Sequence, residues 1–207
     1  MLLVLLVPIV AQAAPKFPLK TGSTGKDVLR IQKVLCDHGY VLTQDGVYST
    51  ATGYYVKQYQ KAHGLYADGK VGIYTWYSMT ATKRDRYNID LLSKLIMREA
   101  GGSGDRGQLA VANVAMNYAR KAHRTIEAEI KSGRYSPARN WSRFMRTRPT
   151  ARCRANALRA YFGGEKAFSG VQPYYFHDHE WTPKEGSWRT KLTCLGEVGD
   201  NIFYGAK

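Results

Sequence analysis

The sequence contains little cysteine, and this limits the role that disulfides can have in the protein. Three cysteines occur among 207 residues, Cys36, Cys153 and Cys194, so at most one internal disulfide can form. The count excludes a small domain held together mainly by disulfides. Two arrangements remain open, a bridge between Cys153 and Cys194 or three free thiols.

Acidic residues are also few, and this leaves a large positive charge. The chain has 16 Asp and Glu against 31 Lys and Arg, a formal net charge of +15. Most of the excess lies in residues 81–207, which hold 23 basic and 12 acidic side chains. Such a charge favours a polyanionic partner, which could be nucleic acid, an anionic membrane surface or a bacterial wall.

The apolar run at the start, residues 1–13, is too short for an ordinary membrane span, and Pro8 interrupts it. It lacks a basic segment before it, but Ala11-Gln12-Ala13 has the small-x-small pattern of a signal-peptidase site. We predict that residues 1–14 are a signal peptide, and that the chain is exported to the periplasm or cell wall without stable membrane insertion. An uncleaved membrane anchor is the alternative.

What the chain does contain is enough apolar and aromatic material for packed cores, 44% and 12% of the residues. Apolar residues recur at helical spacing from Lys26 to Gly39 and again from Thr50 to Gly64, and a short third helix is predicted from Thr75 to Met79. Asp45-Gly46 and Asp68-Gly69 are turn sequences about twenty-three residues apart, which indicates a weak internal repeat.

The second half contains a glutamate at the end of an apolar helical stripe. The spacing of Leu92, Leu95, Ile96 and Glu99 puts all four on one face of a helix that Asp90 would cap. Three glycines within residues 101–104 end this helix, and a second one is predicted from about Gln108. A carboxyl against apolar neighbours has a raised pKa, which suits a general acid. The alternative is a surface glutamate that pairs with Arg98 or Arg106.

Residues 19–80 contain a series of motifs that resembles a known family. The motifs are Gly22-Ser23-x-Gly25, Gln32, Gly39-Tyr40, Asp45-Gly46, Gln60, Gly64-Leu65, Asp68-Gly69 and Thr75-Trp76. They resemble the small three-helix peptidoglycan-binding domain of bacterial and phage wall hydrolases. The resemblance implies a non-catalytic domain over residues 15–80 that concentrates the protein on its polymer. The polar residues 81–88 are predicted to be a linker.

Residues 89–207 resemble a second family at both ends. The shared features are Glu99-Ala100, Gly107-Gln108, Ala110-Val111-Ala112, Asn117, Tyr174-Tyr175-Phe176, Trp188 and the ending Gly199-x-x-Ile202-Phe203-Tyr204. They resemble the SleB/CwlJ-type cell wall hydrolases, although Ser103 stands where that family commonly has a second glutamate. The resemblance implies a lysozyme-like, mostly helical domain with a small β element. The whole chain is therefore predicted to be mainly α (α+β).

That resemblance also implies an activity, lytic transglycosylation between N-acetylmuramic acid and N-acetylglucosamine, which needs a single carboxyl. Glu99 would be the catalytic residue, without metal or cofactor, and the predicted substrate contacts are Asn117, Tyr174, Tyr175 and Trp188. The predicted partner is peptidoglycan, bound by a monomer, with no nucleic acid.

Several alternatives remain open. Asp105 as a second carboxylate would make a muramidase that uses water. His177, His179 and His123 could hold zinc in an amidase. The arginine-rich and aromatic residues 120–160 could bind nucleic acid, or the chain could bind the wall without cleaving it.

Overall fold

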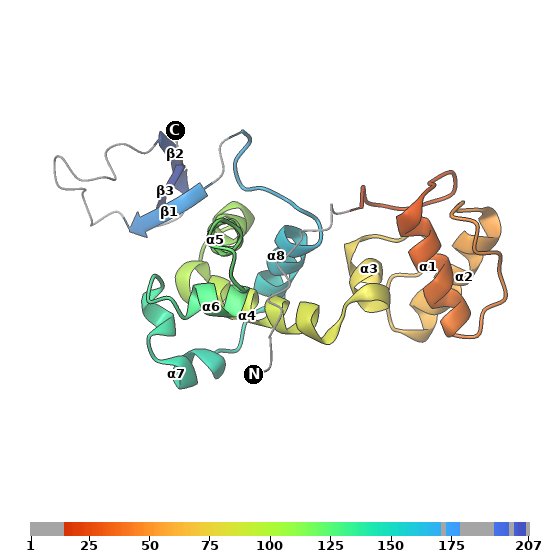
Figure 1. Ribbon diagram of the computed structural model, residues 1–207, viewed down its shortest axis with the longest axis horizontal. Coiled ribbons are helices and arrows are strands. Elements are labelled where there is room, and N and C mark those ends of the chain that lie inside the picture. The colour runs from red at the N-terminus through yellow and green to blue at the C-terminus, as the bar shows by residue number, and fades with distance from the viewer. Residues whose placement is uncertain (1–14, 171–172, 179–192, 199–200, 206–207) are drawn as a thin grey trace, which may run out of the picture. The chain divides into compact units, whose positions relative to one another are not determined.

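In the computed structural model, the described residues are 15–170, 173–178, 193–198 and 201–205. The chain forms two compact units, one over Ala13–Arg86 and one that includes Tyr87–Lys207. The described residues contain eight α-helices, one 3-10 helix and three strands, which confirms a mainly α fold with a small β element (Figure 1). None of the described helices is both long and apolar enough to cross a membrane. The predicted signal peptide lies outside the described residues.

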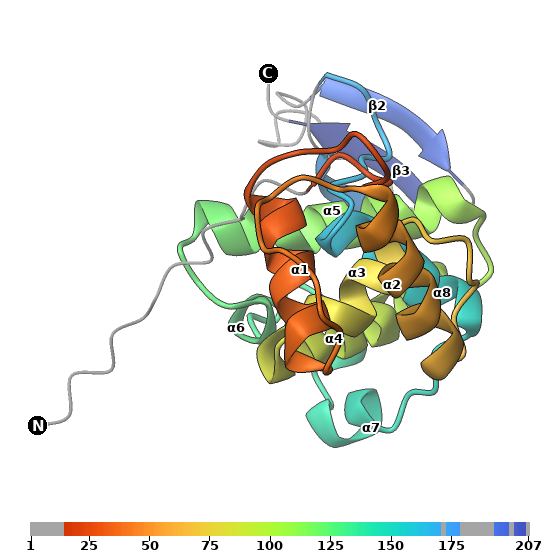
Figure 2. The ribbon, with the colours of Figure 1, turned by 90° about the vertical axis from the view of Figure 1, so that its right-hand side faces the viewer.

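The first unit contains three helices, α1 (Lys26–Asp37), α2 (Thr50–Ala62) and α3 (Ile73–Thr80) (Figure 2). Helix α1 contacts both α2 and α3. Most of the apolar residues at helical spacing face inward, and the fully buried side chains include Val28, Ile31 and Val56, although Ala62 at the end of α2 is exposed. Trp76 is also part of this core, with only 3% of its surface exposed. The helical spacing of the sequence therefore predicted this unit correctly.

The two Asp-Gly turns of the first unit are each held by a buried glutamine from the preceding helix. The Gln32 side-chain amide donates to Asp45 Oδ1 at 2.8 Å, and its carbonyl oxygen accepts from the Gly46 N–H at 2.8 Å. Gln60 does the same at the second turn, where it donates to Asp68 Oδ1 and accepts from the Gly69 N–H. The repeat therefore includes a buried glutamine as well as the turn.

Gln60 also donates to the Lys70 carbonyl at 2.8 Å and to the Thr75 hydroxyl at 3.1 Å. We expect Gln60→Leu to leave these groups and the Gly69 N–H without partners, and to lower the free energy of unfolding by about 3 kcal/mol. Urea titration of the full chain measures this, and amide exchange at Gly69 localises it. Gln58→Leu, on the partly exposed part of the same helix, is the control. Equal stability of the two variants would show that Gln60 does not hold the turn.

The second unit begins on α4 (Lys83–Ala100), a longer helix than the sequence suggested. The predicted linker, residues 81–88, is helical from Lys83 onward, and the two units divide within it, between Arg86 and Tyr87. The prediction that Asp90 caps the helix was wrong, since Asp90 lies inside it. Thr82 lies at the start instead, where its N–H and hydroxyl both donate to Asp85 Oδ2. Asp90 pairs with Lys94 one turn later. A polar first turn with its own cap continues the helix, although it buries little apolar surface.

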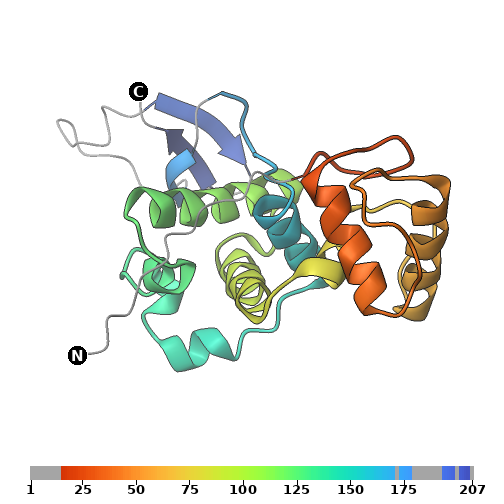
Figure 3. The same ribbon diagram turned by 45° about the vertical axis from the view of Figure 1, so that its right-hand side comes forward.

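Helix α5 (Asp105–Lys121) is the central element of the second unit. It contacts α6 (Ile126–Ile130), α8 (Ala151–Tyr161) and strand β1 (Pro173–Asp178). Figure 3 shows the sheet on one side of α5 and helices α4 and α6 on the other. Between α6 and α8 lie a 3-10 turn (Ser136–Ala138) and the short helix α7 (Trp141–Met145). The buried residues of α5 occupy most of its circumference, as its central position requires.

The sheet has three antiparallel strands in the order β1-β3-β2, with β2 at Thr193–Val198 and β3 at Asn201–Gly205. In its register, Phe176 of β1 pairs with Phe203 of β3, and Gly196 of β2 pairs with the same residue. Phe203 is fully buried. The aromatic segment at residues 174–176, which the sequence marked, thus forms one edge of the sheet beside α5.

The predicted disulfide does not form, since all three cysteines are free thiols. Cys153 is buried on α8, where its sulfur accepts a hydrogen bond from the Thr150 hydroxyl at 3.1 Å. Cys194 is exposed on β2. Three free thiols, the other arrangement that the sequence left open, is the one found.

Candidate active site

Glu99 lies in the last turn of α4, at the end of its most buried stretch. Leu92, Leu95 and Ile96, the three residues predicted to share its face, are completely buried. The Glu99 side chain itself is partly exposed, so it is placed between the apolar interior and solvent. No described residue forms an ion pair or a hydrogen bond with its carboxyl group.

This position changes the acidity of Glu99. Burial raises the pKa of its carboxyl from 4.5 to about 7, because desolvation disfavours the charged form, and the positive charge of Arg98 opposes the rise. The pKa values of the Asp45 and Asp105 carboxyls shift in the other direction, because hydrogen bonds lower both of them. Glu99 can therefore hold a proton near neutral pH and release it to a nearby group.

The loop after Glu99, residues 101–104, is fastened to the inside of the unit by Gln108. This side chain is fully buried and donates to the carbonyl oxygens of Gly101, at 3.3 Å, and Ser103, at 3.2 Å. Asn156 of α8 donates to Gln108 Oε1 at 2.9 Å. Gly107 permits the close approach, because a Cβ there would lie 2.8 Å from the Cβ of Ser103. The loop that follows the acid is therefore held in place from two helices.

Asp105, the alternative second carboxylate, is engaged by basic side chains. Arg152 Nε lies 3.0 Å from Oδ1, and an Arg159 nitrogen lies 3.3 Å from Oδ2. Asn156 donates to Oδ1 at 3.1 Å, and together these groups lower the pKa of Asp105. A carboxylate with both oxygens in ion pairs is a poor base, so this geometry favours a structural role in joining α5 to α8.

The sequence did not indicate that Glu129, on α6, would be a buried ionic centre. The carboxylate is fully buried, Arg134 Nε donates to Oε1 at 2.9 Å, and Arg124 Nε lies 3.0 Å from Oε2 without the alignment of a hydrogen bond. The Arg134 guanidinium also lies over the Tyr118 ring, 3.7 Å from its centre. A buried acid between two arginines holds the segment after α6 against α5.

Tyr135 follows the Glu129 ionic centre along the chain, and the sequence did not indicate a role for it either. It is 2% exposed, and its hydroxyl has no hydrogen-bond partner among the described residues. Burial raises the pKa of Tyr135, and the negative charges of Glu129 and Glu99 add to the effect. The fold therefore brings a buried hydroxyl into the electrostatic range of Glu99 from a segment 36 residues away.

Asn117, a predicted substrate contact, lies inside the second unit. Asn117 is buried, donates to the Pro173 carbonyl at 3.1 Å and accepts from an Arg120 nitrogen at 3.1 Å. Its amide therefore joins α5 to β1, and its contact with substrate stays a prediction. Tyr174 and Tyr175 lie on β1, and Trp188 lies outside the described residues. The structure leaves those three predictions untested.

The histidine alternative falls partly on residues that the structure does not describe, since His179 is among them. His123 is exposed in the turn after α5 and has a positive φ of 49°. Among the described residues, no three His, Cys, Asp or Glu side chains are grouped so that they could hold a metal ion.

We expect the raised pKa of Glu99 to affect stability. The folded state binds this proton more tightly than the unfolded state, so the favourable contribution is complete below about pH 4.5 and is lost as the pH rises through about 7. Glu99→Gln should therefore raise the free energy of unfolding by at most about 3 kcal/mol near pH 8 and change it little near pH 4. Urea titrations at the two pH values measure this. An equal effect at both would contradict the raised pKa.

Comparison with known proteins gives two matches. Residues 24–79 match the family model described as "Putative peptidoglycan binding domain". The crystal structure of Burkholderia AP3 phage endolysin aligns with 25% sequence identity and a TM-score of 0.30, covering 56% of this chain and 61% of the endolysin. The chain thus matches less than two thirds of that protein. No curated protein matches.

The first of these matches covers the three-helix unit almost completely. It includes α1, α2, most of α3 and the two glutamine-held turns. The first unit is therefore similar to peptidoglycan-binding domains, and the match supports peptidoglycan as a partner of this chain.

Proposed function

We propose that this protein cleaves the glycan strand of peptidoglycan as a lytic transglycosylase, with Glu99 as its acid and base. The observation that carries the proposal is the partly buried Glu99 carboxyl, whose pKa is raised to about 7. Peptidoglycan as the substrate is supported by the binding-domain match over residues 24–79. The resemblance of residues 89–207 to SleB/CwlJ-type hydrolases supports the reaction type.

In the proposed reaction, the protonated Glu99 carboxyl donates its proton to the oxygen that links N-acetylmuramic acid to the next sugar. The bond from that oxygen to C1 breaks, and the leaving sugar departs as an alcohol. Glu99, now a carboxylate, takes the proton from the 6-hydroxyl of the same muramic acid as O6 bonds to C1. The product is a 1,6-anhydro sugar, the acid is regenerated, and no water is consumed.

A single carboxyl is sufficient for this reaction, whereas the usual hydrolytic routes need a second one. The described residues offer Asp105 in the first turn of α5, but its ion pairs with Arg152 and Arg159 engage both oxygens. The geometry therefore supports transglycosylation over hydrolysis through Asp105. The three-helix unit would keep the enzyme on the wall between cleavages and so raise the local concentration of the polymer.

We expect Glu99→Gln to abolish the lysis of purified sacculi and to leave their binding unchanged, because the amide cannot donate and recover a proton. Turbidity loss measures lysis, and cosedimentation measures binding. Glu127→Gln, which removes a partly exposed carboxylate on α6, is the matched control and should retain activity. Lysis by the Glu99→Gln variant would reject the assignment.

Mass spectrometry of the released fragments distinguishes the mechanisms. Transglycosylation leaves anhydro-muramyl ends, which lack the water that the reducing ends from a muramidase contain. New amino groups from a cut at the lactyl amide would indicate an amidase.

The pH dependence of cleavage should follow the protonation of Glu99. Because the acid must carry its proton, kcat/KM is expected to fall about tenfold for each pH unit above 7. Initial rates on soluble glycan fragments at constant ionic strength measure the profile. A rate that stays constant well above neutral pH would contradict a general-acid role for this carboxyl.

A further inference from the structure

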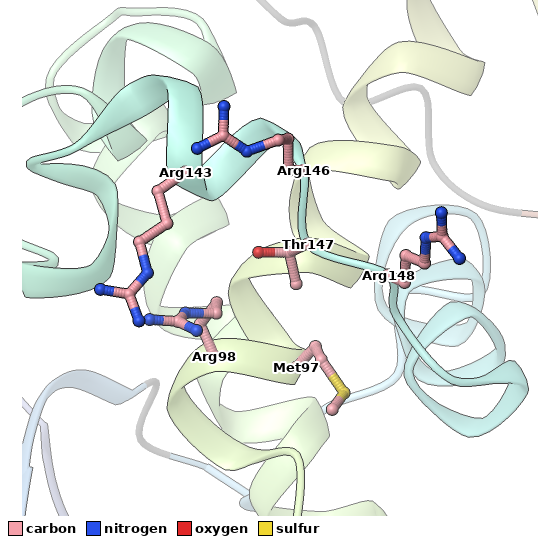
Figure 4. Close-up of a pocket in the computed structure, with 6 residues that line it drawn as sticks. All are labelled: Met97, Arg98, Arg143, Arg146, Thr147 and Arg148. Carbon is pink, nitrogen blue, oxygen red and sulfur yellow. The ribbon is translucent and has the colours of Figure 1, made fainter.

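A hollow of about 380 Å³ opens beside the end of α4, and the segment from α7 to Arg148 forms its opposite side (Figure 4). Four of its six lining residues are arginines and none is acidic. The lining residues are Met97, Arg98, Arg143, Arg146, Thr147 and Arg148. The hollow therefore concentrates positive charge at one place on the second unit.

These four arginines lack an ion-pair partner among the described residues, unlike several other arginines of the second unit. No described residue forms an ion pair with any of the four guanidinium groups, or accepts a hydrogen bond from them. By contrast, Arg124 and Arg134 pair with Glu129, and Arg152 and Arg159 pair with Asp105. The arginines paired with Glu129 and Asp105 thus join segments of the fold, whereas the four that line the hollow are available to a ligand.

The arrangement inside the hollow favours an anion. Arg98 and Arg143 extend toward one another from α4 and α7 (Figure 4). Like charges that face each other repel, and a bound anion would replace this repulsion with two attractions. A planar guanidinium matches a carboxylate in geometry and can bind it through two parallel hydrogen bonds. Thr147 adds a hydroxyl, and Met97 adds an apolar surface for an attached alkyl chain.

The hollow also adjoins the proposed acid. Arg98 immediately precedes Glu99 on α4, and its positive charge acts on the Glu99 carboxyl. Successive residues on a helix point about 100° apart, so the two side chains diverge from one short stretch of backbone. Because both side chains leave the same turn of α4, a polymer that extends past Glu99 can reach the hollow through Arg98.

We infer that this hollow binds a carboxylate of the peptide stem carried by the glycan strand that Glu99 cleaves. The inference rests on the proposed function and adds a recognition element to it. Peptidoglycan carries its negative charge on stem peptides at regular intervals along an uncharged sugar chain. Binding of one stem peptide beside Glu99 would fix the position of the glycan strand along its length. It would also favour peptide-bearing substrate over bare glycan.

Binding of soluble glycan–peptide fragments tests this, measured on the full chain with Glu99→Gln so that the fragments are not consumed. The fragments are prepared with their carboxylates free or converted to amides. Arg143→Gln with Arg146→Gln should raise the Kd for free-carboxylate fragments by about threefold to tenfold, and should not change the Kd for amidated ones. Arg143→Lys with Arg146→Lys keeps the charge and should lose only part of the effect.

The matched control is Arg154→Gln with Lys166→Gln, which removes two exposed charges that have no described partners and do not line the hollow. It should retain the dependence on free carboxylates. Any contribution of the three-helix unit is the same in every variant, so the difference between the two fragment types isolates the hollow. Raising the salt concentration should reduce that difference.

Three results would overturn the inference. One is an equal loss of affinity for free and amidated fragments in the Arg143→Gln, Arg146→Gln variant. Another is a loss confined to phosphate-containing wall polymers, which would assign the hollow to phosphate. The third is a loss of duplex DNA binding with fragment binding unchanged. None depends on cleavage, so failure of the carboxylate site is distinguished from failure of the proposed function, which the lysis of sacculi by Glu99→Gln decides.

Discussion

The apolar packing of α4 fixes one carboxyl at the edge of the interior of the second unit. Helix α4 is buried around most of its circumference from Leu91 to Ile96, so its last turn cannot rotate without exposing that core. Glu99 is therefore kept partly desolvated, with a pKa raised to about 7. The desolvation cost that this imposes on the carboxylate is what makes the proton available near neutral pH.

The neighbouring polar groups are arranged so that they do not cancel this effect. Gln108 donates to the carbonyl groups of the loop after Glu99, and Asn156 donates in turn to the Gln108 side-chain oxygen, so neutral amides hold this backbone without bringing a cation to the carboxyl. The nearby arginines Arg152 and Arg159 are engaged by Asp105. Arg98 acts on Glu99, but its positive charge opposes the rise in pKa only in part.

Positive charge in the second unit consequently has two separate uses. Buried or paired arginines, such as Arg134 on Glu129, fasten one segment to another. Unpaired ones gather where α7 meets the end of α4. The sequence shows only a basic stretch over residues 120–160, which is equally compatible with nucleic-acid binding. The structure shows that several of its arginines pair internally, and that four without a described ion pair line one hollow beside the end of α4.

The sequence by itself determined the three helices of the first unit, the Asp-Gly turns and the position of Glu99 on its helical face, because these depend on spacing along one element. The turns and glutamines were visible as motifs, but only the folded chain showed that each glutamine reaches across to its turn. The Cys153–Cys194 bridge that the sequence left open is not found, since all three thiols are free. The partner of the buried Asn117 amide, the Pro173 carbonyl, is chosen by packing between elements, and residue spacing contains no information about that. The tertiary structure alone decided which charges pair internally and which remain available, since that depends on segments far apart in the sequence meeting in a medium of low polarity.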